Sequence, residues 1–252
     1  MPSSPRPIVR LSTVEAYNKW ADVYDHDGNI LQLHDDLSFA ATIPLIFTTH
    51  PPHRLLDIGC GTGRNTLKLF HALPADAEII AVDVSEGMMR KAQERLSVAK
   101  DIVANDTRKV TWILHDINDP STALSGRTGI VGAVVSTLVL EHLYLDRFFA
   151  EVAAVLGKGG WLYLTSMHPE QGAVSRAGFV GSEDGKEIKI QGVSFNHQIS
   201  DILAEARKVG LRLEGEVEER GVDDVEHAKR LGRRAEKWIG VKMHVKMTFF
   251  MQ

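Results

Sequence analysis

The 252-residue chain contains a single cysteine, Cys60, so no intramolecular disulfide can form and a reducing compartment is expected. No stretch approaches the ~18 consecutive apolar residues of a membrane-spanning helix. The first ten residues also lack the apolar core of a secretory signal. These absences predict a cytoplasmic protein that does not associate with membranes.

An excess of charge of one sign is also missing. The 29 basic and 33 acidic residues give a formal net charge of −4, whereas a general nucleic-acid binder would carry a basic excess. Histidines, carboxylates and the single cysteine show no metal-ligand spacing, so no metal is expected. The chain has no internal repeat that would indicate a solenoid.

Short apolar runs alternate with amphipathic stretches along most of the chain, which predicts an α/β fold. Strands are expected at residues 54–58, 78–83, 110–115, 133–139, 161–166, 211–219 and 241–251. Helices are expected at 64–73, 86–100, 143–156, 199–209 and 224–239. The first five strands are almost continuously apolar, as strands buried on both faces are. We therefore expect a Rossmann-like, seven-stranded, mostly parallel sheet with one antiparallel edge strand and helices on both faces.

Two segments do not fit this alternation. Residues 12–48 read as a helical extension, and residues 168–197 read as a glycine-dotted insertion with a hairpin around Glu183-Asp184-Gly185. We expect residues 1–48 to form an extension with a helical lid, and residues 49–252 to form the main domain. Both the lid and the 168–197 insertion would lie at one rim of the sheet, as a cap over a ligand.

A glycine-rich loop follows the first expected strand, in Leu55-Leu-Asp-Ile-Gly-Cys-Gly-Thr-Gly63. Glycines let a backbone approach a ligand closely, although tight packing alone also explains them. A dinucleotide fingerprint needs its third glycine at position 64, which is Arg64 here, and Asp57 would repel a pyrophosphate. The loop therefore disfavours NAD and favours a cationic or zwitterionic ligand.

Acidic residues stand in or just after three consecutive expected strands: Asp57, Asp83 and Asp116. In a parallel sheet such positions converge on one crevice. Asp83 follows the glycine loop at the distance of a ribose-binding acid, and Asp116 could accept a hydrogen bond from an adenine amine. Asp83 has an alternative role as a helix cap, but Ser85 is the better N-cap candidate.

These motifs resemble those of class I S-adenosylmethionine-dependent methyltransferases over about residues 12–168. Leu55–Gly63 is similar to the first family motif, Asp83 to the ribose-binding acid, and His115-Asp116-Ile117 to the adenine-contacting motif. The loop at 156–161 is similar to the one before the fifth strand, although Gly157-Lys-Gly replaces the usual proline. Residues 16–25 resemble the opening helix of the ubiquinone- and menaquinone-biosynthesis subgroup. Residues 165–179 resemble, less specifically, fungal small-molecule methyltransferases.

The resemblance implies S-adenosylmethionine as cofactor and S-adenosylhomocysteine as product. Tyr17 would close over the cofactor, Ser136 would stand at the fourth strand end, and Cys60 would be a small residue inside the loop. Together with the motifs above, it gives these cofactor-binding candidates: Tyr17, Asp57, Gly59, Cys60, Gly61, Gly63, Asp83, Val84, Met88, Asp116, Ile117 and Ser136.

Methyl transfer from a sulfonium is an in-line displacement that the protein assists by positioning and desolvation. A hydroxyl or acid acceptor also benefits from a histidine base. His168, after the fifth strand, and His142, after the fourth, are the catalytic candidates, with loop or helix-start roles as alternatives. Trp20, Tyr24 and His197 are the substrate-binding candidates, although helix-to-sheet packing would also explain the Tyr17, Trp20, Tyr24 spacing.

The sequence thus predicts methyl transfer to a small, partly apolar acceptor, with O-methylation favoured over N- and C-methylation. The expected partner is a small molecule rather than nucleic acid or membrane, and the protein is expected to be a monomer or a homodimer. One alternative is a cofactor-binding enzyme that catalyses another reaction, such as a cyclisation. The other is a regulatory or complex subunit that binds the cofactor without methylating.

Overall fold

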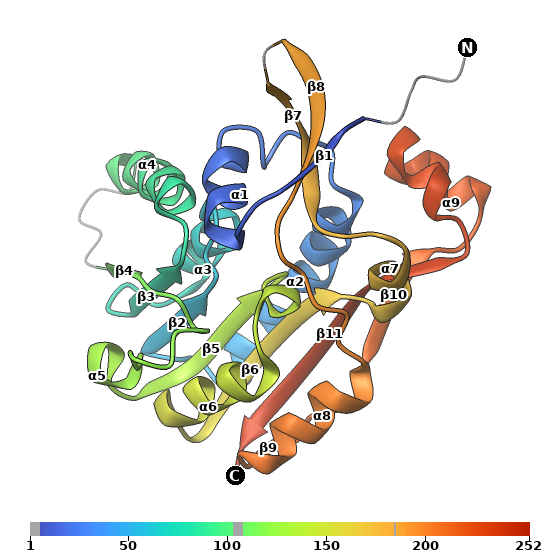
Figure 1. Ribbon diagram of the computed structural model, residues 1–252. Helices are drawn as coiled ribbons and strands as arrows, with labels where there is room; N and C mark the ends of the chain where they lie inside the picture. The colour runs from blue at the N-terminus through green and yellow to red at the C-terminus, as the bar shows by residue number, and fades with distance from the viewer. Residues whose placement is uncertain (1–5, 103–107, 184) are drawn as a thin grey trace.

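The computed structural model describes residues 6–102, 108–183 and 185–252. Its main sheet has the strand order β10-β11-β6-β5-β2-β3-β4, and β9 also pairs with β11 (Figure 1). Five adjacent strands, from β6 to the edge strand β4, run parallel, and these are the five apolar runs of the sequence. They are β2 (Arg54–Ile58), β3 (Glu78–Asp83), β4 (Lys109–Leu114), β5 (Val131–Thr137) and β6 (Leu156–Met167). The expected α/β, Rossmann-like architecture is confirmed.

The C-terminal part of the sheet differs in detail from the expectation. β11 (Val241–Met251) runs antiparallel to β6 and lies one place in from the edge, not at it. The single strand expected at 211–219 is two strands, β9 (Leu211–Leu213) and β10 (Glu218–Val222), which pair with opposite ends of β11. Gly215 lies between them with a φ of +69°, a conformation that bends the chain and ends the first strand.

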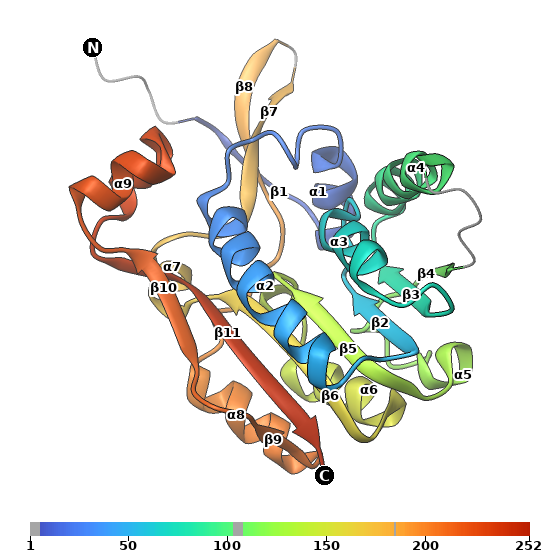
Figure 2. The same ribbon diagram turned by 180° about the vertical axis from the view of Figure 1, so that it is seen from behind.

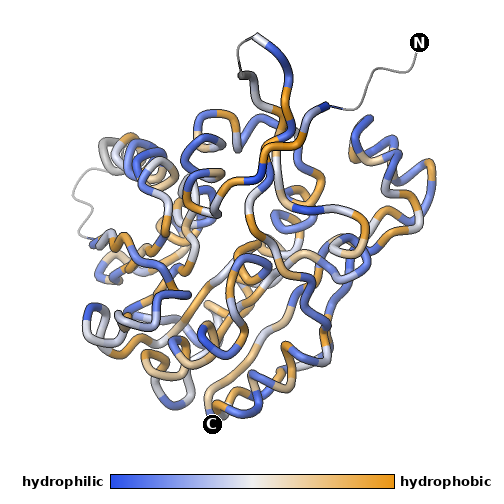
Figure 3. Tube along the Cα trace, viewed as in Figure 1, coloured by the Kyte–Doolittle hydropathy of each residue, from blue (hydrophilic) through white to orange (hydrophobic). Residues whose placement is uncertain are grey.

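Helices cover both faces of the sheet, as expected. In Figure 2 the nearer face carries α2 (Ile30–Thr49), α3 (Arg64–Ala72) and α4 (Glu86–Ile102). The other face carries α5 (Ser125–Thr128), α6 (Leu145–Val155) and α8 (Ile199–Lys208), seen in front in Figure 1. Neighbouring β2 residues divide between the faces, since Leu55 packs with the α2–α3 cluster and Leu56 with the α6–α8 cluster. Figure 3 shows the resulting apolar sheet beneath helices with polar outer sides.

The first part of the N-terminal extension and the 168–197 insertion form one structure at the rim, whereas the rest of the extension, α2, packs on a face of the main sheet and is not part of a lid. β1 (Ile8–Arg10) pairs in parallel with β8 (Lys186–Gln191), which forms a hairpin with β7 (Gly178–Glu183). α1 (Thr13–Trp20) packs beneath this three-stranded sheet, and Trp20 stacks on Phe179 with ring centroids 5.1 Å apart. The insertion opens with α7 (Pro169–Val174). This assembly, which we call the cap, lies at the carboxyl end of β2, β3 and β5 (Figure 1).

The helix expected at 224–239 is interrupted. α9 (Val225–Leu231) ends at Gly232, whose φ of +101° breaks the helix, and a 3₁₀-helix, η2 (Arg233–Trp238), follows. Ala228 and Ala235 are buried against Ile30 and Leu31 at the start of α2. This packing places α9 and η2 beside the cap. No helix of the described residues has both the length and the apolar character needed to cross a membrane.

Candidate functional site

The glycine loop between β2 and α3 is shaped by close contacts that exclude side chains. Gly59 has a φ of +73°, and a Cβ there would lie 2.0 Å from Val139 Cγ2. Gly63 has a φ of +79°, and its Cβ would lie 2.9 Å from Ala92 in α4. The first glycine lets the segment after β5 approach the loop, and the last lets α3 and α4 pack. Glycine at these two positions therefore lets neighbouring segments lie closer to the loop than a side chain would allow.

Asp83, at the end of β3, is fixed by two backbone donors. Its Oδ2 accepts a hydrogen bond from Gly61 N and its Oδ1 from Ser85 N, both at 2.8 Å. Burial raises the pKa of the Asp83 carboxyl, and these backbone hydrogen bonds oppose the rise. Each carboxylate oxygen keeps a further lone pair for a ligand hydroxyl. At the next strand end, Asp116 accepts a hydrogen bond from Asn118 N at 2.8 Å through Oδ1.

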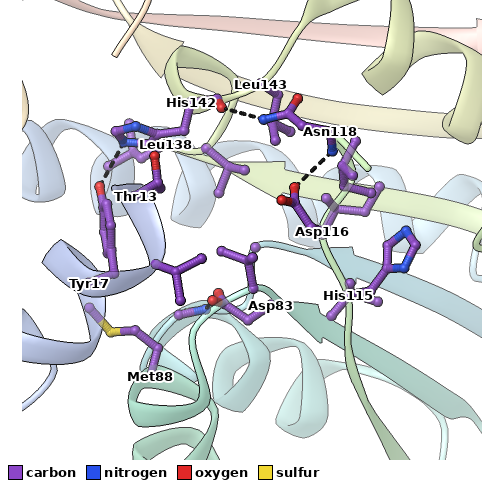
Figure 4. A pocket seen from close by; sticks show the side chains of 18 of the residues that line it. Thr13, Tyr17, Asp83, Met88, His115, Asp116, Asn118, Leu138, His142 and Leu143 are labelled. Atoms are coloured by element: carbon purple, nitrogen blue, oxygen red, sulfur yellow. Dashed lines mark hydrogen bonds between the residues drawn. The ribbon is translucent and has the colours of Figure 1, made fainter. Parts of the chain in front are cut away.

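These strand ends and α1 enclose a cavity that we call the strand-end chamber (Figure 4). Ten of the predicted site residues line it, and besides Tyr24 they are Tyr17, Gly59, Gly61, Asp83, Val84, Met88, Asp116, Ile117 and His142. The structure therefore brings together the acids of β3 and β4, the glycine loop and the first helix, as a single ligand site at the strand ends would require.

Four predicted cofactor residues are not among the lining residues: Asp57, Cys60, Gly63 and Ser136. Asp57 Oδ2 accepts a hydrogen bond from Thr66 Oγ1 at 2.6 Å, and burial raises the pKa of its carboxyl to about 7. Burial likewise raises the pKa of the Cys60 thiol. Ser136 is fully buried in β5. In the structure these residues support the loop and the strand, and any direct cofactor contact from them stays a prediction.

Several lining residues are not among the predicted site residues, most notably Leu138, which follows β5. Leu138 has a φ of +57°, the only positive φ of a non-glycine residue in the part of the chain described by the structure. Such strained backbone clusters at functional sites, but no local sequence signal reveals it. Thr13, Val139 and Asn118 were not predicted either, and His115, in the segment similar to the adenine-contacting motif, lines the chamber too.

The lid helix α1 is anchored directly over this chamber. Asn18 Oδ1 accepts hydrogen bonds from Ser85 Oγ at 2.7 Å and from Gly87 N at 2.9 Å, which ties α1 to the start of α4. Next to it in the chain, the Tyr17 hydroxyl lies 2.8 Å from His142 Nε2, as Figure 4 shows. Anchoring through Asn18 therefore fixes where the Tyr17 ring stands above the chamber.

The hydrogen bonds of His142 define its tautomer. Its Nδ1 lies 2.6 Å from the carbonyl oxygen of Val193, which can only accept, so Nδ1 carries a proton. In the neutral ring Nε2 then holds a lone pair and accepts the hydrogen bond from the Tyr17 hydroxyl. Because Val193 belongs to the insertion, the cap itself orients this histidine.

A second cavity, of about 320 Å³, lies between the cap, α2 and η2, and we call it the cap chamber. Its volume is within the range of ~300–1,000 Å³ typical of small-molecule sites. Tyr17, Tyr24 and Leu138 line both chambers and so form their common wall. The predicted substrate residues Trp20 and Tyr24 lie here. α1 ends at Trp20, yet the rings of Tyr17, Trp20 and Tyr24 still cluster, with centroids 5.0–6.0 Å apart.

Two predicted histidines do not line either chamber. His168 was expected to project over the crevice, and the structure corrects this: the residue caps α7 and is 3% exposed. Its Nδ1 accepts from Glu170 N at 3.1 Å, and its Nε2 lies 2.7 Å from Glu219 Oε2 in β10. His197 Nε2 donates to Leu143 O at 3.0 Å, and its ring stacks on Phe195. Local hydrogen bonds thus occupy both ring nitrogens of His168 and Nε2 of His197.

Comparison with known proteins identifies the type of domain. A family model described as a methyltransferase domain matches residues 55–160. An uncharacterised methyltransferase of Emericella nidulans is 38% identical over 93% of this chain and 89% of its own length. Two solved structures share the fold. The [4+2]-cyclase SpnF has a TM-score of 0.61 at 17% identity, with 98% of each chain covered. The magnesium protoporphyrin IX methyltransferase of Synechocystis, solved with S-adenosylhomocysteine bound, has a TM-score of 0.58 at 15% identity, with 94% of each chain covered.

Proposed function

This chain belongs to the class I S-adenosylmethionine-dependent methyltransferases, and we propose that it methylates an oxygen atom of a small molecule held in the cap chamber. The observation that carries the proposal is the common wall of the two chambers, where the Tyr17 hydroxyl is hydrogen-bonded to His142 Nε2. A donor on one side of this wall and an acceptor on the other would meet beside a proton-accepting group.

The residues of the strand-end chamber fit the cofactor. Gly59 and Gly61 would admit its amino-acid end against bare backbone, and the Asp83 carboxylate would accept hydrogen bonds from ribose hydroxyls. Asp116 and Met88 would hold the adenine. When bound there, the cofactor supplies an electrophilic methyl group. The protein's own contribution is to position the reactants and to exclude water, since α1 and the cap cover this edge of the sheet.

His142 is the base of the proposed reaction, acting through Tyr17. Burial and neighbouring acids raise the pKa of the Tyr17 hydroxyl well above its usual value, so the phenol stays protonated in the resting protein. It can receive a proton from the acceptor hydroxyl while passing its own proton to His142 Nε2, which holds the free lone pair. His168 has no such route, because its ring nitrogens are bound to Glu170 N and Glu219.

Calorimetry with S-adenosylmethionine, S-adenosylhomocysteine and NAD tests the cofactor half of the proposal. We expect the first two to bind and NAD not to bind, and Asp83→Ala to weaken their binding at least ~100-fold because it removes the fixed carboxylate opposite the ribose. Glu86→Gln, which changes a carboxylate three residues away that does not line the chamber, is the matched control and should bind normally. A folded protein that binds neither compound would contradict the proposal.

The transfer half is tested on metabolite fractions by measuring S-adenosylhomocysteine together with products that are heavier by one methylene unit. Tyr17→Phe and His142→Gln should lower kcat by roughly 10²–10⁴-fold with cofactor affinity retained, whereas exposed Tyr144→Phe should not. A product of unchanged mass would indicate a cyclase-type reaction instead. Cofactor binding without any turnover would indicate a regulatory subunit. Cytoplasmic location and a monomeric or homodimeric state stay predictions.

A further inference from the structure

The charged residues of the cap chamber are not evenly distributed. Five cationic side chains line it, against two carboxylates, Asp27 and Glu141. The cations are Arg6, Arg176, Lys189, Arg234 and Lys237. Arg6 pairs with Glu187 at 2.8 Å, and Arg176 donates to Ser194 O at 3.3 Å. Among the described residues, Lys189, Arg234 and Lys237 have no carboxylate within ion-pair distance, and we call these three the cationic rim.

The cationic rim is assembled from two distant parts of the chain. Lys189 comes from β8 of the insertion, whereas Arg234 and Lys237 come from η2. The Arg234 side chain lies against Gly28, and its Cδ would be 3.5 Å from a Cβ placed on that glycine. Lys237 Nζ lies 4.7 Å from the centroid of the Trp238 ring, which also lines the chamber. Packing thus holds like charges near one another: burial, and then the charges of Arg234 and Lys189, lower the pKa of Lys237.

Of the two carboxylates, Glu141 follows β5, three residues after Leu138 of the common wall. Asp27 stands next to Gly28, against which Arg234 packs, and the Arg234 charge opposes the rise that burial causes in the pKa of the Asp27 carboxyl. Both act electrostatically on Tyr17 and Tyr24, whose pKa values they raise. Glu141 accepts a hydrogen bond from Ser166 Oγ at 3.1 Å, and Asp27 Oδ2 accepts from Trp20 Nε1 at 3.1 Å. Asp27 Oδ1 is buried without a partner among the described residues. The chamber therefore has an excess of cations, and Trp20, Phe179 and Met243 are among the other residues that line it.

We propose that the cationic rim binds an anionic group of the acceptor, a carboxylate or a phosphate, while a neutral hydroxyl of the same molecule faces Tyr17. An anion beside Glu141 would be repelled, but near Lys189 and Lys237 it would relieve the repulsion among the three cations of the rim. The acceptor class is thus a hydroxy acid or hydroxyl-bearing phosphate with an apolar or aromatic body. This inference rests on the proposed function and names its substrate class.

Binding to the S-adenosylhomocysteine-loaded protein tests the rim without requiring methyl transfer. The probes are 3-(4-hydroxyphenyl)propionate, its neutral amide, and 4-hydroxyphenyl phosphate as the phosphate arm. We expect at least one anion to bind about tenfold or more tightly than the amide at low salt, with the difference shrinking as salt is raised. Comparing the two anions tells a carboxylate site from a phosphate site. Equal affinity of both anions and the amide would overturn the inference.

Matched variants test whether the cationic rim binds the anionic probes. Arg234→Gln and the double variant Lys189→Gln/Lys237→Gln should each weaken anion binding about three- to tenfold or more and leave the amide unchanged. Arg233→Gln, which removes the neighbouring exposed cation that does not line the chamber, should have no effect. Unchanged affinity for S-adenosylhomocysteine shows that each variant is folded. Equal losses from Arg233→Gln and Arg234→Gln would overturn the inference in favour of general surface charge.

The failures of the two proposals are distinguishable. If the protein methylates nothing but still binds anions through the rim, the anion site stands and the proposed methyl transfer is wrong. Methylation of a neutral acceptor, with an unchanged KM in the rim variants, would retain the function and reject the anion site.

Discussion

The strand-end chamber and the cap chamber share a wall but are built in different ways. The strand-end chamber is lined mainly by residues at or just after the ends of β2 to β5, many of them in the recognised motifs, together with residues of α1 and its flanks. The cap chamber consists of side chains drawn from the N-terminal extension, the insertion and η2, between Arg6 and Met243. A site at the ends of strands can largely be predicted from short sequence motifs. A site formed where distant elements pack together cannot.

The two chambers also differ in charge. Asp83 and Asp116 give the strand-end chamber carboxylates, which suit a cationic donor. The cap chamber carries more cations than acids, and the cations that lack a carboxylate partner in the described residues are at the rim. Each chamber would therefore disfavour the ligand of the other. Substitutions that damage one chamber and spare the other test this separation.

The largest expected effect comes from Gly59→Ala. The new Cβ would lie 2.0 Å from Val139 Cγ2 on a backbone of positive φ, so the loop or the segment after β5 must move. We expect the free energy of unfolding to fall by about 3 kcal/mol or more, with cofactor binding lost. Urea denaturation and calorimetry measure these two effects.

Gly61→Ala is the matched control for this prediction. Its φ is also positive, at +55°, but the atom nearest to a Cβ added at this position is Gly59 O, at 4.0 Å. Only the backbone strain, about 1–2 kcal/mol, should appear. Adding Val139→Ala to Gly59→Ala should restore part of the lost stability. Equal losses for the two glycines would mean that the Val139 contact is unimportant.

A smaller effect confined to the cap chamber is expected from Phe179→Ala. Its ring stacks on Trp20 at an interplanar angle of 16°, and removing it should loosen the hairpin from α1. We expect anionic-probe affinity to fall about tenfold and tryptic cleavage at Lys186 to accelerate, while S-adenosylhomocysteine affinity changes less than about twofold. Ser182→Ala, on the same strand, is the control. A matching loss of cofactor affinity would show that the chambers are not separable.

The last expected effect is a pH dependence of stability that arises beneath the strand-end chamber. Because burial raises the pKa of Asp57 to about 7, the folded protein holds a proton that the unfolded chain, with a pKa near ~3.9, has released. This contribution to stability is complete below about pH 4 and is lost as the pH rises to about 7. Asp57→Asn should flatten that part of the profile, measured by urea midpoints from about pH 4 to 8. If the urea midpoints of the wild type and of Asp57→Asn change with pH in parallel, the raised pKa of Asp57 is contradicted.

Sequence predicts the structure well where local chemistry decides it. The five parallel strands, the hairpin near Gly185 and the positions of Asp83 and Asp116 follow from strand periodicity, turn residues and motif spacing. Prediction from the sequence was wrong about the single strand at 211–219 and the unbroken helix at 224–239, because Gly215 and Gly232 adopt positive φ values that composition alone does not require. It also placed His168 over the crevice, whereas Glu219, 51 residues later, binds the ring from β10.

By itself, the sequence determined the fold class, the family and the cofactor, because these depend on hydrophobic periodicity and on residues adjacent in the chain. Only the tertiary structure decided that His142 rather than His168 faces the common wall, and that Lys189, Arg234 and Lys237 meet at one rim. The physical reason is the distance along the chain over which each effect acts. Periodicity and turn geometry act over a few residues, but the charge and tautomer of a group depend on neighbours that packing brings from anywhere in the chain.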